Sequence, residues 1–137
     1  MANAAANPPC TILVVDDEPE VLRLVTRILS AEGTQILAAG TGAKALAIAR
    51  QRGLDLVMLD IKLPDMSGTQ VLRRIRRIDP GVPVIMVTSY GSVDTVRTSM
   101  ELGAFDYLTK PFDNQEVRRV AREALASRAA GSVPSRA

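Results

Sequence analysis

Short continuous hydrophobic runs alternate along the chain with stretches that have helical periodicity. Runs rich in Val, Ile, Leu, Met and Ala predict buried strands at 11–16, 34–39, 54–60, 82–88 and 104–109. Between and after them, apolar residues recur every three or four positions, which predicts helices at 19–32, 41–52, 69–78, 92–102 and 113–127. Pro19, Ser92 and Asp113 suit the first turn or the N-cap of three of these helices, and Gly33 and Gly53 suit the ends of two.

Five strand–helix units in strict alternation predict one α/β domain at residues 11–128, with an N-terminal tail at 1–10 and a tail or the start of a linker at 129–137. Continuous apolar strands are typical of a parallel sheet that helices cover on both faces. The expected architecture is therefore a doubly wound sheet with right-handed crossovers. In such sheets the carboxyl ends of the strands share one edge, where ligands bind.

Polar residues follow four of the predicted strands at that edge. The first strand ends in Asp16 and Asp17, the third in Asp60, the fourth in Thr88 and the fifth in Thr109 and Lys110. Adjacent carboxylates repel one another, and three carboxylates without nitrogen or sulfur ligands favour Mg²⁺ or Mn²⁺, which would offset the repulsion. The metal, the Lys110 ammonium and the Thr88 hydroxyl suit a dianionic phosphoryl group. Asp60 is the candidate nucleophile.

Composition narrows the choice of chemistry. The 137 residues contain no His, which excludes His metal ligands and His general bases, and a single Cys, Cys10, which cannot form an internal disulfide. The net charge of +2 gives no general signature of a nucleic-acid binder, and the basic run at 73–77 is interpreted as a solvated helix face. No secretory signal and no membrane-spanning run is found, so a cytoplasmic protein is expected.

Four segments in order, "ILVVDDEP", "VMLDIKLPDMSG", "VIMVTSY" and "GAFDYLTKPFD", resemble the receiver domain of bacterial two-component response regulators. The resemblance covers roughly residues 11–128. Its last two segments look most like receivers of nitrogen-regulation-type transcriptional regulators. It implies a flavodoxin-like fold with five parallel strands in the order 2-1-3-4-5, and five helices.

The resemblance also implies a magnesium-dependent phosphorylation site. Asp60 would accept a phosphoryl group from the phosphohistidine of a sensor histidine kinase or a phosphotransfer protein. Asp17, Asp60 and the backbone carbonyl of Lys62 would bind Mg²⁺ directly, and Asp16 would act largely through water. The resemblance further implies that Thr88, Ser89 and Lys110 bind the phosphoryl group.

A conformational switch is implied as well, with Thr88 moving toward the phosphoryl group and Tyr107 moving inward. The peptide bond before Pro111 would be cis. The changed surface would include the helix from Ser92, the strand with Tyr107 and the last helix, and it would act on a partner, an output domain or a second copy in a homodimer. Bulky Tyr90 is expected to slow loss of the phosphoryl group. The domain would be no enzyme beyond its own phosphorylation and dephosphorylation.

Two other functions remain open at this stage. A flavin-binding electron carrier has the same topology, but the first loop, "DDEP", would repel a flavin phosphate, and aromatic residues are scarce. A receiver-like interaction module that works without phosphorylation would keep the fold and lose the chemistry. No membrane contact and no direct nucleic-acid contact is expected, and a stand-alone receiver and the N-terminal part of a longer regulator are both compatible with the sequence.

Overall fold

The computed structural model describes residues 10–30, 34–89 and 93–129. Within these residues, five strands and five helices alternate. The strands are β1 (Cys10–Val15), β2 (Thr34–Ala39), β3 (Leu56–Asp60), β4 (Val84–Thr88) and β5 (Asp106–Thr109). The helices are α2 (Pro19–Leu29), α3 (Gly42–Gln51), α4 (Gly68–Ile78), α5 (Val93–Glu101) and α6 (Asn114–Ala129).

The five strands form one parallel sheet in the order β2-β1-β3-β4-β5, which confirms the predicted fold class. The register brings the polar strand ends together: Asp60 at the end of β3 pairs with Val87, and Thr88 at the end of β4 pairs with Thr109. The chain order reverses between β1 and β3, so the strand ends around Asp16 and Asp60 lie at the switch point of the sheet.

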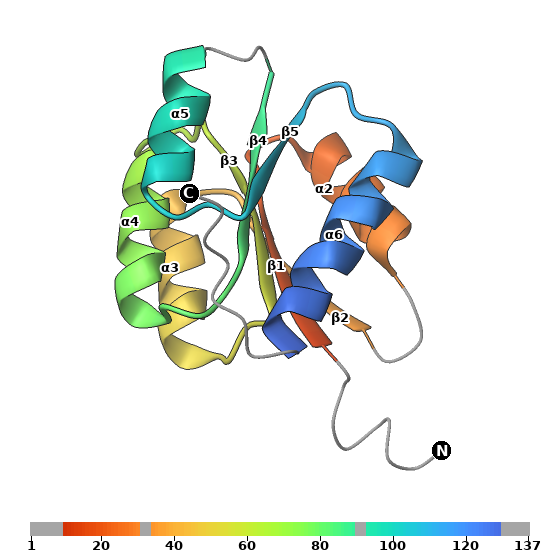
Figure 1. Cartoon of the computed structure of the whole chain (residues 1–137), viewed down its shortest axis with the longest axis horizontal. Helices are drawn as coiled ribbons and strands as arrows, with labels where there is room; N and C mark the ends of the chain where they lie inside the picture. The colour runs from red at the N-terminus through yellow and green to blue at the C-terminus, as the bar shows by residue number, and fades with distance from the viewer. Residues whose placement is uncertain (1–9, 31–33, 90–92, 130–137) are drawn as a thin grey trace.

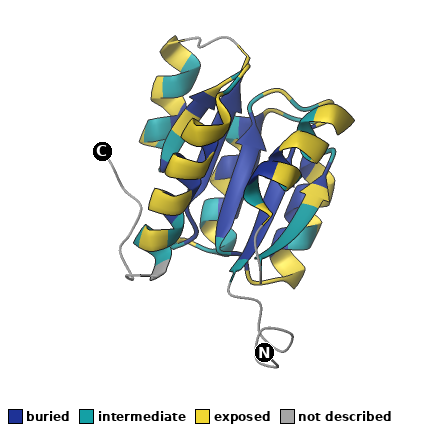
Figure 2. Ribbon diagram, turned by 90° about the vertical axis from the view of Figure 1, so that its right-hand side faces the viewer, coloured by how far each residue is buried: buried dark blue, intermediate teal, exposed yellow. Residues whose placement is uncertain are grey.

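Helices cover the sheet on both faces, with α2 and α6 on one side and α3, α4 and α5 on the other (Figure 1). Alternate residues of β1, β3 and β4 enter two separate cores: Met58 packs with the α2–α6 side, and the next residue, Leu59, packs with the α3–α4 side. The central strands are buried, and the exposed residues lie mainly on the helices (Figure 2). This double burial explains why the strands are continuous apolar runs.

Local signals in the sequence account for the starts of several helices. Pro19 occupies the first turn of α2, where its missing N–H costs nothing. The Thr41 hydroxyl accepts a hydrogen bond from the Lys44 N–H and caps α3. Ser67 and Gln70 form a reciprocal capping box at the start of α4. Ser92, expected to cap α5, lies outside the described residues.

Several element boundaries differ from those predicted. β3, β4 and β5 begin two residues later than their apolar runs, because Leu54, Val82 and Ala104 are buried in the core without belonging to the strands. Cys10, assigned to the tail, pairs with Thr34 in the sheet.

Four helices also end at other residues than expected, and α3 and α5 each end one residue early, at Gln51 and Glu101. α2 ends at Leu29, and the N–H of the following Ser30 donates to the Thr26 carbonyl. Gly33, predicted to end this helix, lies outside the described residues. α6 continues to Ala129, two residues beyond its predicted end. In the part of the chain that the structure describes, no helix has the length and apolar character needed to cross a membrane.

Candidate functional site

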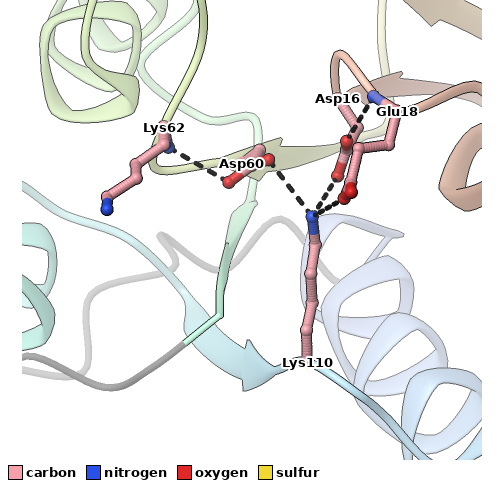
Figure 3. Close-up of polar contacts among 5 residues, drawn as sticks. All are labelled: Asp16, Glu18, Asp60, Lys62 and Lys110. Carbon is pink, nitrogen blue, oxygen red and sulfur yellow. Dashed lines mark hydrogen bonds and ion pairs between the residues drawn. The ribbon is translucent and has the colours of Figure 1, made fainter.

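Four strand ends deliver the polar residues singled out in the sequence to one edge of the sheet. Asp16 follows β1, Asp60 ends β3, Thr88 ends β4 and Lys110 follows β5. Asp16, Asp60 and Thr88 are buried, with 2%, 5% and 5% of their surface exposed. The close-up in Figure 3 shows that the Asp16, Asp60 and Lys110 side chains converge, although their positions are far apart along the chain.

The Lys110 ammonium lies between three carboxylates. Its Nζ is 2.8 Å from Asp16 Oδ2, 3.0 Å from Glu18 Oε1 and 3.2 Å from Asp60 Oδ2 (Figure 3). An ammonium has three donors and no acceptor, so each carboxylate satisfies one N–H. Lys110 therefore offsets part of the repulsion that the acidic residues after β1 and β3 would otherwise cause.

Backbone groups fix the direction of the two buried carboxylates. Asp60 Oδ1 accepts a hydrogen bond from the Lys62 N–H at 3.0 Å, and Asp16 Oδ1 accepts one from the Glu18 N–H at 2.9 Å. The Asp16 N–H in turn donates to the Ala39 carbonyl at 3.0 Å, which ties the first acidic loop to β2. Both side chains are thus held by backbone as well as by Lys110, as a preorganised site requires.

The electrostatics of the site change two pKa values in the same direction for different reasons. Burial is the largest cause that raises the pKa of Asp60, and the negative charge of Asp16 adds to it, while the Lys62 N–H and Lys110 oppose the shift. For Lys110, burial acts to lower the pKa, but hydrogen bonds to Asp16 and Glu18 outweigh it and raise the pKa above its ordinary value. Lys110 is therefore a permanent cation at neutral pH.

We expect Asp60→Asn to stabilise the metal-free protein at pH 7. Because the folded-state pKa of Asp60 is raised, keeping this carboxylate ionised costs folding free energy at neutral pH, and that cost is relieved as the pH falls through the folded-state pKa. A gain of about 1 kcal/mol at pH 7 is typical when a residue of a destabilised functional site is replaced. Urea unfolding in EDTA between pH 4 and pH 8 measures it.

The gain should shrink toward acid pH, since the wild-type protein regains stability there and the variant does not. A variant that is less stable than wild type at pH 7, or a gain that is the same at every pH, would contradict the prediction. Asp55→Asn, which changes a half-buried carboxylate just before β3 at the opposite edge of the sheet, controls for a general effect of charge.

The acidic residues fit a hard divalent cation. Asp16, Asp17 and Asp60 each offer a carboxylate oxygen, and these three atoms lie within 4.8 Å of one another. Oxygen-only donors of this kind match Mg²⁺, which is commonly bound by one or two carboxylates and retains several waters. Asp17 is exposed and the other two are buried, so the set opens to solvent on one side.

The other predicted residues lie around this cluster. The Thr88 carbonyl accepts the Lys110 N–H at 2.7 Å, and Ser89 is exposed beside Thr88. The Lys110–Pro111 peptide bond is cis. Tyr107 on β5 is 42% exposed, in an outward position. Tyr90 lies outside the described residues.

Two polar residues near the site were not singled out as site residues in the sequence. Glu18 was noted only as a third adjacent acid, and its role as a partner of Lys110 depends on a contact between residues 92 positions apart. Asp65 accepts two hydrogen bonds from the backbone at the start of α3. No local sequence signal reveals either partner, although the position of Asp65 in the loop "KLPD" directly after the Asp60 strand could have drawn attention to it.

Comparison with known proteins supports the resemblance to receiver domains that was noted in the sequence. The model of the response regulator receiver domain family matches residues 12–122. The chain is 44% identical over 113 residues to the probable transcriptional regulatory protein TcrX of Mycobacterium tuberculosis, covering 82% of this chain and 48% of that protein. It is 40% identical over 114 residues to sporulation initiation phosphotransferase F of Bacillus subtilis, covering 83% and 92%. The chain thus spans about half of one relative and nearly all of the other.

A solved structure agrees with the fold and with the sub-group noted in the sequence. The receiver domain of NtrX from Brucella abortus superposes with a TM-score of 0.80 at 37% identity, covering 85% of this chain and 98% of that one. The residues that match the family model include most of the described sheet and all the residues gathered at its carboxyl edge. This chain therefore belongs to the response regulator receiver domain family, the signalling module of two-component systems.

Proposed function

We propose that this chain is a phosphorylation-dependent signalling switch in which Asp60 accepts a phosphoryl group from a phosphohistidine of a sensor kinase or phosphotransfer protein. The observation that supports this most is the position of Lys110 Nζ, 3.2 Å from Asp60 Oδ2 and 2.8 Å from Asp16 Oδ2. A fixed cation beside a buried carboxylate at the edge of a parallel sheet suits the receipt of a dianion.

In the proposed reaction an oxygen of the Asp60 carboxylate attacks phosphorus. The new P–O bond forms as the P–N bond to the donor imidazole breaks, and the electron pair of that bond stays on the imidazole nitrogen, which takes up a proton. The Lys62 N–H, 3.0 Å from Asp60 Oδ1, holds the plane of the nucleophile. Lys110 and the Thr88 hydroxyl would bind phosphoryl oxygens, and small Ser89 would leave them room.

We further propose that Asp17, Asp60 and the Lys62 carbonyl hold Mg²⁺ directly, with Asp16 acting largely through water. The bound cation would neutralise charge on the phosphoryl oxygens. Within the chain, Asp16 keeps Lys110 in place through their 2.8 Å ion pair. Lys110 thus contacts both the nucleophile and the metal-binding side of the cluster.

The proposed output is a change of surface around α5, β5 and α6. A phosphoryl group adds nearly two negative charges and three strong acceptors to the buried edge. Thr88 and Lys110 gain contacts only in the phosphorylated state, which biases the domain toward that state. Tyr107, exposed on β5, would then turn inward, and the altered surface would bind a partner, an output domain or a second copy.

Removal of magnesium is expected to abolish phosphorylation. Intact-mass measurement after incubation with acetyl phosphate should show one phosphoryl adduct in the presence of Mg²⁺ and none in EDTA, because the carboxylate cluster would repel the dianionic donor. Restoring Mg²⁺ to the EDTA sample serves as the control. If Mg²⁺ binds and no adduct forms with either acetyl phosphate or a phosphorylated kinase, the function is that of an interaction module that works without phosphorylation.

A further inference from the structure

The loop between β3 and α4, residues 61–67, is tied to a different part of the fold by Asp65. The Asp65 carboxylate accepts hydrogen bonds from the Gly42 N–H at 2.8 Å and from the Ala43 N–H at 2.9 Å. These amides belong to the first turn of α3 and have no acceptor within that helix. The two bonds are charge-assisted and lie at the positive end of the helix, so they are stronger than neutral ones.

The charge of Asp65 is secured by the same contacts. The hydrogen bonds from Gly42 and Ala43 are the largest causes that lower the pKa of Asp65. The carboxylate lies at the exposed tip of the loop, where it is ionised at neutral pH in any case, and these contacts extend its ionised range to lower pH. A permanent anion at this position keeps both amide contacts over the whole physiological pH range.

The same loop carries the backbone of Lys62, which serves the candidate site directly. The Lys62 N–H orients Asp60, and the Lys62 carbonyl is the proposed backbone ligand of the metal. The base of the loop is closed by the Gly68 N–H on the Ile61 carbonyl at 2.6 Å and by the bridge between Lys62 and Ser67. These contacts stay within the loop and the start of α4.

Among the residues that the structure describes, Asp65 is the one whose side chain joins the tip of this loop to another element, through its hydrogen bonds with the start of α3. The fit there is also close, because a Cβ on Gly42 would overlap the Met66 side chain and come within 2.9 Å of Val71 Cγ2. The start of α3 and the loop therefore interlock without spare room.

The start of α3, which Asp65 contacts, is itself connected to the acidic residues after β1. Gly42 follows β2 by three residues, and the last residue of β2, Ala39, accepts the Asp16 N–H at 3.0 Å. Asp65 thus closes a ring of contacts that runs from Asp16 through the start of α3 to Lys62. The two sides of the proposed metal site, one after β1 and one after β3, are joined directly by the pairing of these strands, and the Asp65 contacts join them a second time through the start of α3.

We propose that Asp65 is a positioning residue for the metal site: it sets where the Lys62 backbone lies relative to Asp16 and Asp17. It touches neither the metal nor the phosphoryl group. The proposal rests on the metal site proposed above, and it adds a residue to the support of that site. Residues that hold the groups around a metal in place typically change its affinity 10- to 100-fold when they are replaced.

The decisive comparison is between Asp65→Ala and Thr41→Ala. Both substitutions remove a cap from the start of α3, since Thr41 Oγ1 accepts the Lys44 N–H at 3.1 Å, but only Asp65 connects the helix to the loop. Isothermal titration with Mg²⁺ should show about tenfold weaker binding for Asp65→Ala. Thr41→Ala should bind Mg²⁺ as wild type does, although its melting temperature falls.

Three further measurements separate an effect on the position of the loop from an effect of the lost charge. Asp65→Asn loses the charge and keeps one acceptor oxygen, so it should bind Mg²⁺ with an affinity between those of wild type and Asp65→Ala. In 0.5 M KCl a pure field effect of the lost charge is screened, whereas a displaced ligand is not, so the weakening in Asp65→Ala should persist. Amide exchange of residues 61–67 should be faster in Asp65→Ala than in Thr41→Ala.

The outcomes discriminate between this proposal and the function on which it rests. If wild type binds Mg²⁺ and Asp65→Ala binds it equally well, the positioning role is overturned and the metal site stands. Equal weakening in Asp65→Ala and Thr41→Ala would also overturn it, since loss of a helix cap would then suffice. Failure of the wild-type protein to bind Mg²⁺ would instead refute the metal site, and the role of Asp65 with it. If Asp65→Ala does not fold, Asp65→Asn provides the same comparison.

Discussion

Asp60→Asn is expected to abolish the phosphoryl adduct completely. The amide oxygen of Asn is a poor nucleophile. Asp16, the other buried carboxylate that contacts Lys110, is proposed to act on the metal through water and not as the acceptor. The measurement is intact mass after incubation with acetyl phosphate and Mg²⁺. Wild type should gain one phosphoryl group, and the variant should gain none at any time of incubation.

Asp55→Asn is the matched control for this loss. Asp55 also adjoins β3, but it lies just before the strand, where its carboxylate accepts the Thr11 N–H at 2.9 Å, and it should leave the adduct intact. Unfolding curves must show that Asp60→Asn remains folded. A phosphoryl group that still appears on the variant, mapped to another residue, would refute Asp60 as the acceptor.

Gly68→Ala is expected to destabilise the protein by about 2–3 kcal/mol, at the upper end of what overpacking costs. A Cβ at this position would overlap the Asp60 carbonyl oxygen and lie 2.7 Å from Ile61 Cα. Those atoms are backbone, so no side chain can turn aside to make room. The β3–α4 loop must shift, and with it the Lys62 N–H that orients Asp60. Phosphorylation should therefore slow markedly in the variant.

Gly53→Ala shows what the same chemical change does in open space. A Cβ on Gly53 would meet nothing within 4 Å, so this substitution should leave stability unchanged or raise it by about 0.5 kcal/mol through the unfolded chain. Urea unfolding of both variants gives the comparison. Equal stabilities for Gly68→Ala and Gly53→Ala would show that the close approach of Gly68 to Asp60 carries no energetic weight.

The fold was predictable because its signals are local and repeated. Each strand is an apolar run, each helix has its own periodicity, and the rule that parallel strands end at one edge brings Asp16, Asp60, Thr88 and Lys110 together before any coordinates are known. The starts of β3, β4 and β5 were misplaced because burial does not require pairing in the sheet. Leu54, Val82 and Ala104 are core residues that precede the ladder.

The residues near the site that the sequence did not reveal are placed by contacts between positions far apart along the chain. Glu18 reaches Lys110 because the loops after β1 and β5 face each other, and Asp65 reaches Gly42 because α3 and α4 lie side by side. Neither pairing has a spacing rule, since the distance along the chain between the partners is set by intervening helices. The sequence predicts at which edge of the sheet the polar residues gather, and the packing of the loops decides which of these residues contact one another.

The division of the interior by the sheet has a consequence for how such a chain tolerates change over evolutionary time. Met58 and Leu59 are neighbours in sequence but belong to separate cores, so a change in volume at one is felt by a different set of side chains from a change at the other. Compensating substitutions are needed only on the same side of the sheet, because contacting residues couple and separated ones do not. The layer formed by α2 and α6 can thus diversify independently of the layer formed by α3, α4 and α5.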